Sequence, residues 1–384
     1  MSGHEVGTRT TPATGARLAY LDNLKTALIA GIIVSHGFNG YTEFGSWPYQ
    51  DVQEVTISEV TETVFVLVLS FGSTFLMGLF FLISGLFTPR SLERKGVRRF
   101  ATDRLLRLGV PFAVFTLLLW PLLMYAVREP ILHEGSYWYW FTHGDPFLDN
   151  GPMWFIGVLL VFSLGYAAWR AVRSAEGPGR TPLRADTLVA LGAAIAGASF
   201  VVRLWFPIDT AQTLNLHLWE WPQCLGMFLF GIACARRGWL SPVPARIVRG
   251  CGFVAIAAAV SIPILILTSD PLGLDEDVYF GGFGWPSLAT SVLEGALAVS
   301  ACVWVVSFAE RRLDRQGDLG RVLARSSYAA FLLQAPVLLG LALAMRPVDT
   351  PAEVKALVVA GVGVVASFAL AWPLVTRTPL GRVL

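Results

Sequence analysis

Three ionisable residues follow one face of the first apolar segment of the chain. Lys25 and His36 lie eleven residues apart in LAYLDNLKTALIAGIIVSHGF, and Asp22 precedes them. In an α-helix that spacing places Lys25 and His36 about 20° apart around the axis and about 16 Å apart along it. Charge inside a membrane helix is costly and usually serves a function, and a neutral imidazole can take a proton from a hydroxyl near pH 7. We therefore expect this face to line a protein interior or a wet cavity.

Each of these residues also has a simpler interpretation. His36 could be a core histidine that bonds to a backbone carbonyl. The long stem of Lys25 could carry its ammonium group to the nearer membrane interface. Both interpretations stay open at this point.

A basic stretch follows the second apolar segment. Residues 89–108 hold seven Lys and Arg, and the small pair Ser84 and Gly85 precedes them. Small residues allow a neighbouring helix or a ligand to approach closely. The stretch could be a surface helix held by anionic lipid, or an arm that binds a cytoplasmic polyanion through guanidinium–phosphate contacts. We expect Pro111 to start the next span, where a missing N–H costs least.

The composition is that of a membrane protein. Hydrophobic residues make up 54% of the chain and charged residues 15%, and the mean hydropathy is +0.59. Soluble domains typically carry about 25% charged residues. Apolar runs of about 20 residues predict an all-α integral membrane protein with ten transmembrane helices. We place these spans at 18–39, 62–88, 109–127, 152–170, 186–203, 219–235, 250–268, 287–309, 326–345 and 353–375.

The basic residues predict the orientation. With the N-terminus in the cytoplasm, only Arg128, Arg203, Arg346 and Lys355 of the 29 Lys and Arg fall on outer segments, which satisfies the positive-inside rule. We therefore predict that both ends are cytoplasmic in a multi-pass protein of the cell membrane. The expected organisation is a tail at 1–17 that lacks a signal-peptide pattern, one membrane domain at 18–375 with the basic arm 89–108, and a tail at 376–384.

Several polar and aromatic residues are candidates for the opposite, outer side. Glu294 is an acid well inside a late apolar run, so it is either buried with a partner or lines the cavity. His143 and Trp154 belong to an aromatic outer stretch, GSYWYWFTHGDPFLDNGPMW, which could stack on a sugar or form an interfacial aromatic belt. The four cysteines show no metal-ligand spacing, so we expect no metal site. The net charge of +2 gives no indication of nucleic-acid binding.

Four motifs, in order along the chain, carry a resemblance to a known family. YLDNLKTALIAGIIVSHG resembles the first helix of the type-three membrane acyltransferase family. FFLISGLF with the basic stretch after it is similar to the second signature of the family, GPMWFIGVLLVFSLGY to the pattern of its fourth span, and SYAAFLLQAPVLLG to its penultimate span. Within the family, the periplasmic-glucan succinyl transferases look most similar.

The resemblance implies a reaction and a set of site residues. In that family an acyl group moves from cytoplasmic acyl-CoA onto a hydroxyl of an extracytoplasmic glycan or similar acceptor, so acyl-CoA would be a co-substrate and no cofactor would stay bound. His36 matches the essential histidine and Lys25 the first basic residue, with Asp22 beside them. Arg104 and Arg107 match the paired arginines of the family, and Ser84 and Gly85 its small pair. With Arg98 and Arg99 of the same basic stretch, we expect these residues to bind acyl-CoA. We expect Glu294, Gln334, Trp154 and His143 on the acceptor side.

One residue departs from the family pattern. Relatives often have a histidine in the penultimate span where this chain has Gln334. An amide can form hydrogen bonds but cannot shuttle a proton at neutral pH. A mechanism that needs a second histidine is therefore in doubt for this chain.

The alternative function is a transporter or flippase for a glycan or a lipid. Transporters commonly show internal repeats with broken helices at matching positions. The sequence shows no such repeat. We therefore favour acyl transfer, with acyl-CoA, a hydroxyl acceptor and the lipid bilayer as partners.

Overall fold

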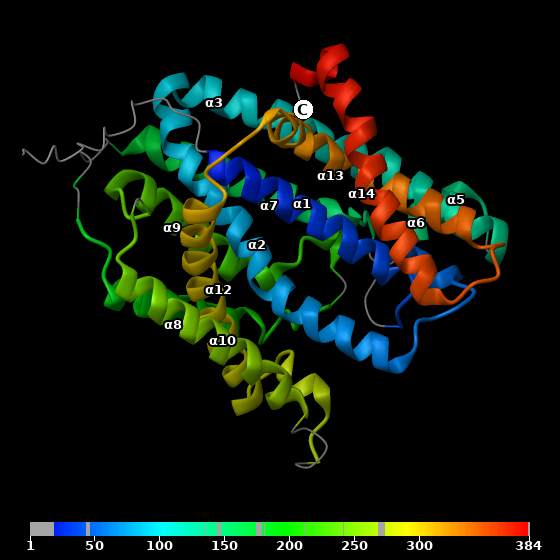
Figure 1. Cartoon of the computed structure of the whole chain (residues 1–384), viewed down its shortest axis with the longest axis horizontal. Coiled ribbons are helices and arrows are strands. Elements are labelled where there is room, and N and C mark those ends of the chain that lie inside the picture. The colour runs from blue at the N-terminus through cyan, green and yellow to red at the C-terminus, as the bar shows by residue number, and fades with distance from the viewer. Residues whose placement is uncertain are drawn as a thin grey trace, which may run out of the picture.

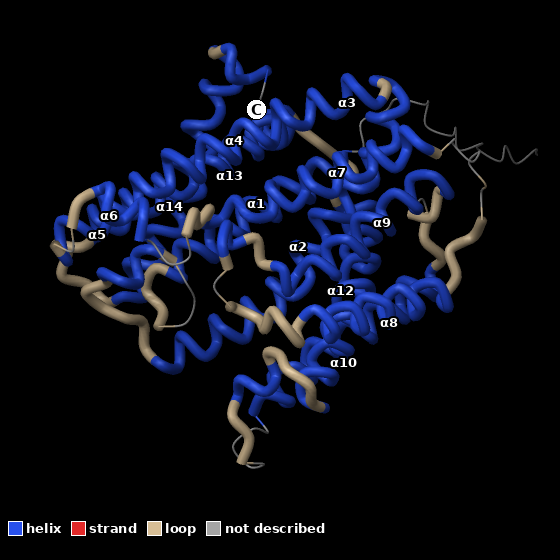
Figure 2. The backbone as a smooth tube through the Cα atoms, turned by 180° about the vertical axis from the view of Figure 1, so that it is seen from behind, coloured by secondary structure: helices blue, strands red, loops and turns tan. Residues whose placement is uncertain are grey.

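The structure is a computed structural model, and it describes residues 19–43, 47–133, 135–143, 147–173, 179, 181–210, 212–240, 242–267 and 273–382. Helices and the loops between them make up this described part (Figure 2). The long helices are α1 (Ala19–Asn39), α2 (Glu59–Lys95), α7 (Trp154–Val172), α8 (Ala185–Val202), α9 (Trp221–Arg237), α10 (Ala245–Leu267), α12 (Trp285–Arg312), α13 (Asp318–Met345) and α14 (Ala352–Arg377). A further helical run covers Val97–Leu132.

The prediction of an all-α integral membrane architecture is confirmed. In the described part of the chain, eight helices are long and apolar enough to cross a membrane. The helices α1 and α9 coincide with the first and sixth predicted spans but are not among the eight. The helix α9 has 17 residues, and α1 carries the polar residues that define its stripe. The total of ten spans and the cytoplasmic location of both ends stay predictions.

The helix α1 runs through the middle of the bundle, with α13 and α14 on one side and α2 on the other (Figure 1). Small residues set the close approach of α1 to α14, because a Cβ on Gly37 would lie 2.8 Å from the Cα of Ala360. At the predicted cytoplasmic end, Asn23 donates to the carbonyl groups of Leu313 and Arg315 at 2.8 and 3.0 Å. These bonds hold the start of α1 against the connection from α12 to α13.

Gly85 has a packing role. A Cβ on Gly85 would lie 2.2 Å from the carbonyl oxygen of Phe228 in α9, and one on Gly231 would lie 2.2 Å from that of Leu82 in α2. The two glycines let the backbones of α2 and α9 touch, as small residues do in membrane helix pairs. The small size of Gly85 therefore serves helix packing.

The expected start of the third span at Pro111 is wrong. The chain bends at Gly96, which has a φ of 73°, and a continuous helical run then begins at Val97. The segments of this run are α3 (Val97–Arg104), a π-helical turn (Leu105–Gly109), α4 (Val110–Val114), a second π-helical turn (Phe115–Leu119) and α5 (Trp120–Leu132). The basic stretch 89–108 is therefore the end of α2 joined to the first turns of this run.

A tyrosine replaces the hydrogen bond that Pro111 cannot make. In an α-helix the N–H of residue 111 would donate to the carbonyl of Arg107. The hydroxyl of Tyr328 in α13 donates to this carbonyl instead, at 2.8 Å. The loss of one backbone donor thus ties the basic stretch to α13.

Candidate active site

His36 lies in the last turn of α1, between two side chains that fix its ring. The imidazole stacks on Trp47, with ring centroids 4.5 Å apart and planes 18° apart. Its Nδ1 lies 3.2 Å from Oε1 of Gln334 in α13. An amide oxygen only accepts hydrogen bonds, so Nδ1 carries the proton and the lone pair is on Nε2. This tautomer leaves Nε2 able to act as a base.

Gln334 is therefore a neighbour of the candidate base. The sequence places Gln334 on the acceptor side, and the structure brings it into direct contact with His36. Its side chain is fully buried, and its Nε2 has no hydrogen-bond partner among the described residues. The amide holds the ring and selects its tautomer, which are tasks that need no proton transfer.

The segment after α1 forms a cap over His36. We define the outer cap as residues 40–43 and 47–58, which include a 3₁₀ helix at Pro48–Val52 and the stacking residue Trp47. Glu54 anchors the cap, because it accepts from Nζ of Lys355 at 2.5 Å and from the hydroxyl of Tyr49 at 2.7 Å. Burial alone would raise the pKa of Glu54, but these two hydrogen bonds hold the pKa below its usual value. The cap is thus tied to α14 by a partly buried ion pair.

The polar stripe of α1 is divided between its two ends. Lys25 pairs with Asp22, with Nζ 2.8 Å from Oδ1, and its ammonium group lies 5.2 Å from the ring centroid of Phe87. Asp22 is buried and Lys25 is partly exposed. The pair sits near the start of α1 and His36 near its end. Catalytic roles for Lys25 and Asp22 stay predictions.

The basic stretch presents its arginines in two ways. Arg98 and Arg99 are exposed. Arg107 is also exposed, and its Nε lies 3.3 Å from Asp103. Arg104 is partly buried, with its guanidinium 5.0 Å from the ring centroid of Phe100 and with a buried Nε that has no partner in the described part. The face therefore offers guanidinium donors that an anion can bind.

Ser84 lies in the middle of α2, one position before Gly85. Its carbonyl accepts from the hydroxyl of Thr88 at 2.8 Å. The proposed contact of Ser84 and Gly85 with a donor stays a prediction, and the packing of Gly85 against α9 accounts for its size.

A second histidine, on the predicted outer side, lies between two tryptophans. His217 stacks on Trp154 and on Trp219, with ring centroids 4.5 Å apart in both pairs. Burial lowers the pKa of His217 to about 4. One face of Trp154 is thus covered by protein. The stack is a feature that the aromatic pattern of the sequence alone could not separate from an interfacial belt.

Hydrogen bonds and one ring contact connect the loop that holds His217 to the cap. The indole of Trp120 meets Trp47 edge-on at 6.2 Å and donates to Asp149 at 2.7 Å. Asp149 in turn accepts from the side chain of Asn215 at 3.1 Å. The ring that supports His36 is therefore held by contacts that extend to the connection between α8 and α9.

Glu294 has a partner of its own. Its Oε2 lies 2.5 Å from Nη1 of Arg203, the residue that follows α8, and both side chains are largely buried. Of the two predicted alternatives for Glu294, a buried ion pair or a position that lines the cavity, the structure shows the ion pair. His143 is the last residue of α6 (Tyr137–His143), and its side chain lies outside the described part of the structure.

A comparison with protein families decides the class of this chain. The family model for an acyltransferase domain, acyltransferase 3, matches residues 18–376. The chain belongs to the acyltransferase 3 family. It is therefore a membrane acyltransferase with several apolar helices. No curated protein and no solved structure matches the chain.

Proposed function

We propose that this acyltransferase moves an acetyl or succinyl group from cytoplasmic acyl-CoA to a hydroxyl of an extracytoplasmic glycan or a similar acceptor. The observation that carries the proposal is His36, whose ring is fixed by Trp47 and whose Nδ1 bonds to Gln334. A base held with Nε2 available suits the activation of a hydroxyl. The sequence resemblance to the glucan succinyl transferases supports succinyl as one of the two acyl groups.

The reaction needs one base and no bound cofactor. The acceptor oxygen attacks the thioester carbonyl while Nε2 of His36 takes the hydroxyl proton. The tetrahedral intermediate then collapses, the C–S bond breaks, and the proton on His36 passes to the leaving sulfur. One histidine performs both proton transfers, so a glutamine at position 334 is compatible with the cycle.

The donor is proposed to bind at the basic stretch. Arg104 and Arg107, with Arg98 and Arg99 nearby, would contact the phosphates of coenzyme A, because guanidinium groups match phosphate geometry. Tyr328 bonds to the backbone of Arg107 from α13, and the same helix carries Gln334. A single helix therefore touches both the donor side and the base.

The direction of transfer follows from the predicted topology. With the N-terminus inside, Lys25 and the basic stretch lie toward the cytoplasm and His36 toward the outer half of the membrane. We propose that Gln334, Glu294, Trp154 and His143 lie on the acceptor side. A reporter fused after Gln316 should then report cytoplasm, and one fused near Asp275 should report outside. A cytoplasmic signal at Asp275 would show that the ten-span topology is wrong.

Proteoliposomes test the function itself. Purified protein should consume radiolabelled acetyl- or succinyl-CoA and release free coenzyme A faster when a glycan acceptor is present, with label recovered on the acceptor. A hydroxyl-free analogue of the acceptor is the matched control. If the label moves to the acceptor no faster than in protein-free liposomes for either donor, the proposed reaction is wrong.

A further inference from the structure

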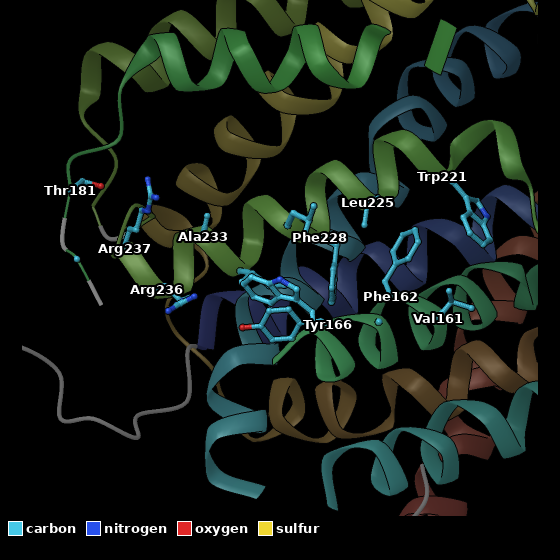
Figure 3. A pocket seen from close by; sticks show the side chains of 15 residues that line it. Val161, Phe162, Tyr166, Thr181, Trp221, Leu225, Phe228, Ala233, Arg236 and Arg237 are labelled. Carbon is cyan, nitrogen blue, oxygen red and sulfur yellow. The ribbon is translucent and has the colours of Figure 1, made fainter. Parts of the chain in front are cut away.

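A groove lies between α7 and α9, with a cavity volume of about 790 Å³ (Figure 3). Its floor is aromatic, because Phe162 and Phe228 are buried there with ring centroids 6.1 Å apart. Apolar residues form its rim, and Val161 and Leu229 are 46% and 50% exposed. In a helix that spans a membrane, such exposed apolar residues face lipid. The groove therefore opens toward the hydrocarbon region.

Cationic and hydroxyl groups gather at one end of this groove. Arg236 and Arg237 lie in the last turn of α9, and Figure 3 shows the hydroxyl end of Tyr166 directed toward Arg236. The Tyr166 hydroxyl is also within electrostatic range of Arg170, Arg236 and Glu93. Arg236 and Arg237 thus place two guanidinium groups at this end of the groove.

The opposite end of the groove is apolar. Trp221 and Val161 lie there, away from the arginines (Figure 3). Between the two ends, a Cβ on Gly165 would meet nothing within 4 Å. No side chain of α7 therefore fills the space beside this glycine. A ligand that fits must be anionic at one end and apolar along its length.

We propose that this groove binds an anionic glycerophospholipid, with its phosphate at Arg236 and Arg237 and an acyl chain along α7 and α9 toward Trp221. Guanidinium groups form charge-assisted bonds to phosphate oxygens, and basic pockets between membrane helices bind anionic headgroups. A free phosphate would leave the apolar length unoccupied. The site is distinct from the candidate active site, because His36 lies among α1, α13 and the outer cap.

Native mass spectrometry of the detergent-purified full chain tests the proposal. The protein is mixed with equal amounts of phosphatidylglycerol and phosphatidylcholine of identical acyl chains, and the retained lipid is counted. The wild type should retain phosphatidylglycerol in preference. The double variant Arg236→Gln/Arg237→Gln should lose about tenfold or more of this retention, as expected when charge-assisted hydrogen bonds are removed. Gly165→Phe, which keeps every charge but fills the groove, should lose a similar factor.

Two variants serve as matched controls. Arg246→Gln/Arg249→Gln removes two exposed arginines at the start of α10. Gly361→Phe adds a ring at an open position of α14. Both should retain phosphatidylglycerol as the wild type does, and a single elution peak with an unchanged thermal unfolding midpoint establishes folding for each variant.

Three outcomes would overturn the proposal. Equal retention of the two lipids would show that the charge has no role, and undiminished retention by Gly165→Phe would place the lipid elsewhere. Displacement of the bound lipid by coenzyme A at the groove would assign the arginines to the donor.

Discussion

The outer cap and the basic stretch differ in how their charges are satisfied. In the cap, Glu54 pairs with Lys355, and Asp51 pairs with Arg128 across to α5. In the basic stretch, Arg98 and Arg99 are exposed, and Nε of Arg104 is buried without a partner among the described residues. The carboxylates of the cap are paired within the protein, whereas guanidinium groups of the basic stretch are available to a ligand.

This difference indicates which part of the molecule is already fixed in position before a substrate binds. A histidine that acts as a base must keep its ring within a narrow range of positions during proton transfer, and fixed surroundings lower the cost of that step. A multiply charged donor can supply its own partners when it binds, because phosphate oxygens satisfy guanidinium donors. We therefore expect changes in the cap to affect rate and stability, and changes in the stretch to affect affinity.

The replacement His36→Ala should have the largest effect. Loss of a general base typically costs about 10²–10⁴-fold in rate, so acyl transfer in proteoliposomes should fall by that factor with insertion unchanged. His133→Asn is the matched control, because His133 is exposed at the end of α5 in a left-handed conformation that asparagine tolerates. Activity of His36→Ala within a few-fold of wild type would remove His36 from the mechanism.

The sequence predicts the elements better than it predicts their contacts. Apolar runs place α1 at 18–39 and α8 at 186–203, within a residue or two of the observed Ala19–Asn39 and Ala185–Val202. The predicted start of the third helix is wrong because proline is typical of a helix start. Here the helix continues through Pro111, and the hydroxyl of Tyr328 in α13 donates to the carbonyl that the missing N–H would have bonded. That compensation depends on Tyr328, which is more than two hundred residues away in the sequence.

The candidate site shows the same limit. A polar stripe identifies His36 from helix periodicity alone, since only local geometry is needed. Its contacts with Gln334 and Trp47 depend on the rotation of α13 and on the course of the loop after α1. No local pattern encodes either one. Sequence therefore indicates the candidate catalytic residue, and tertiary packing decides which side chains contact it.

The second prediction concerns the anchor of the cap. Glu54→Gln leaves Lys355, which is 2% exposed, as a buried charge with a weakened partner. Breaking a fully buried ion pair on one side typically costs about 3–5 kcal/mol. Because Glu54 is 20% exposed, the loss should be smaller than this. The thermal unfolding midpoint in detergent should still fall, and transfer activity should fall with it as Trp47 loses its support.

Two further variants sharpen this result. Asp186→Asn breaks the exposed pair with Arg184, and an exposed pair contributes little to stability, so its midpoint should barely move. The double variant Glu54→Gln/Lys355→Met removes both charges and should recover part of the loss. Equal midpoints for Glu54→Gln and Asp186→Asn would contradict the role of Glu54 as an anchor.

The third prediction concerns the basic stretch. Arg104→Ala and Arg107→Ala should each weaken coenzyme A binding by about 1.5–3 kcal/mol if a charge-assisted bond is lost. Arg311→Ala, at the end of α12, is the control and should spare affinity. Calorimetry at two salt concentrations should show the loss of affinity shrinking as salt rises. Unchanged affinity in both variants would indicate that the stretch is a surface helix held by anionic lipid and not the donor site.

The smallest expected effect is the pH dependence contributed by His217. Burial between Trp154 and Trp219 lowers its pKa to about 4, from about 6.5 in an unfolded chain. The unfolded chain therefore binds the proton more readily, so the contribution of His217 to stability is fully present above pH 6.5 and is lost as the pH falls from 6.5 toward 4. At pH 5 the loss should be on the order of 2 kcal/mol. His217→Asn accepts the same left-handed backbone, at a φ of 48°, but cannot take up a proton. The difference between its unfolding midpoints at pH 7 and pH 5 should be smaller than that of the wild type, and equal differences would show that the stacked imidazole does not titrate in this range.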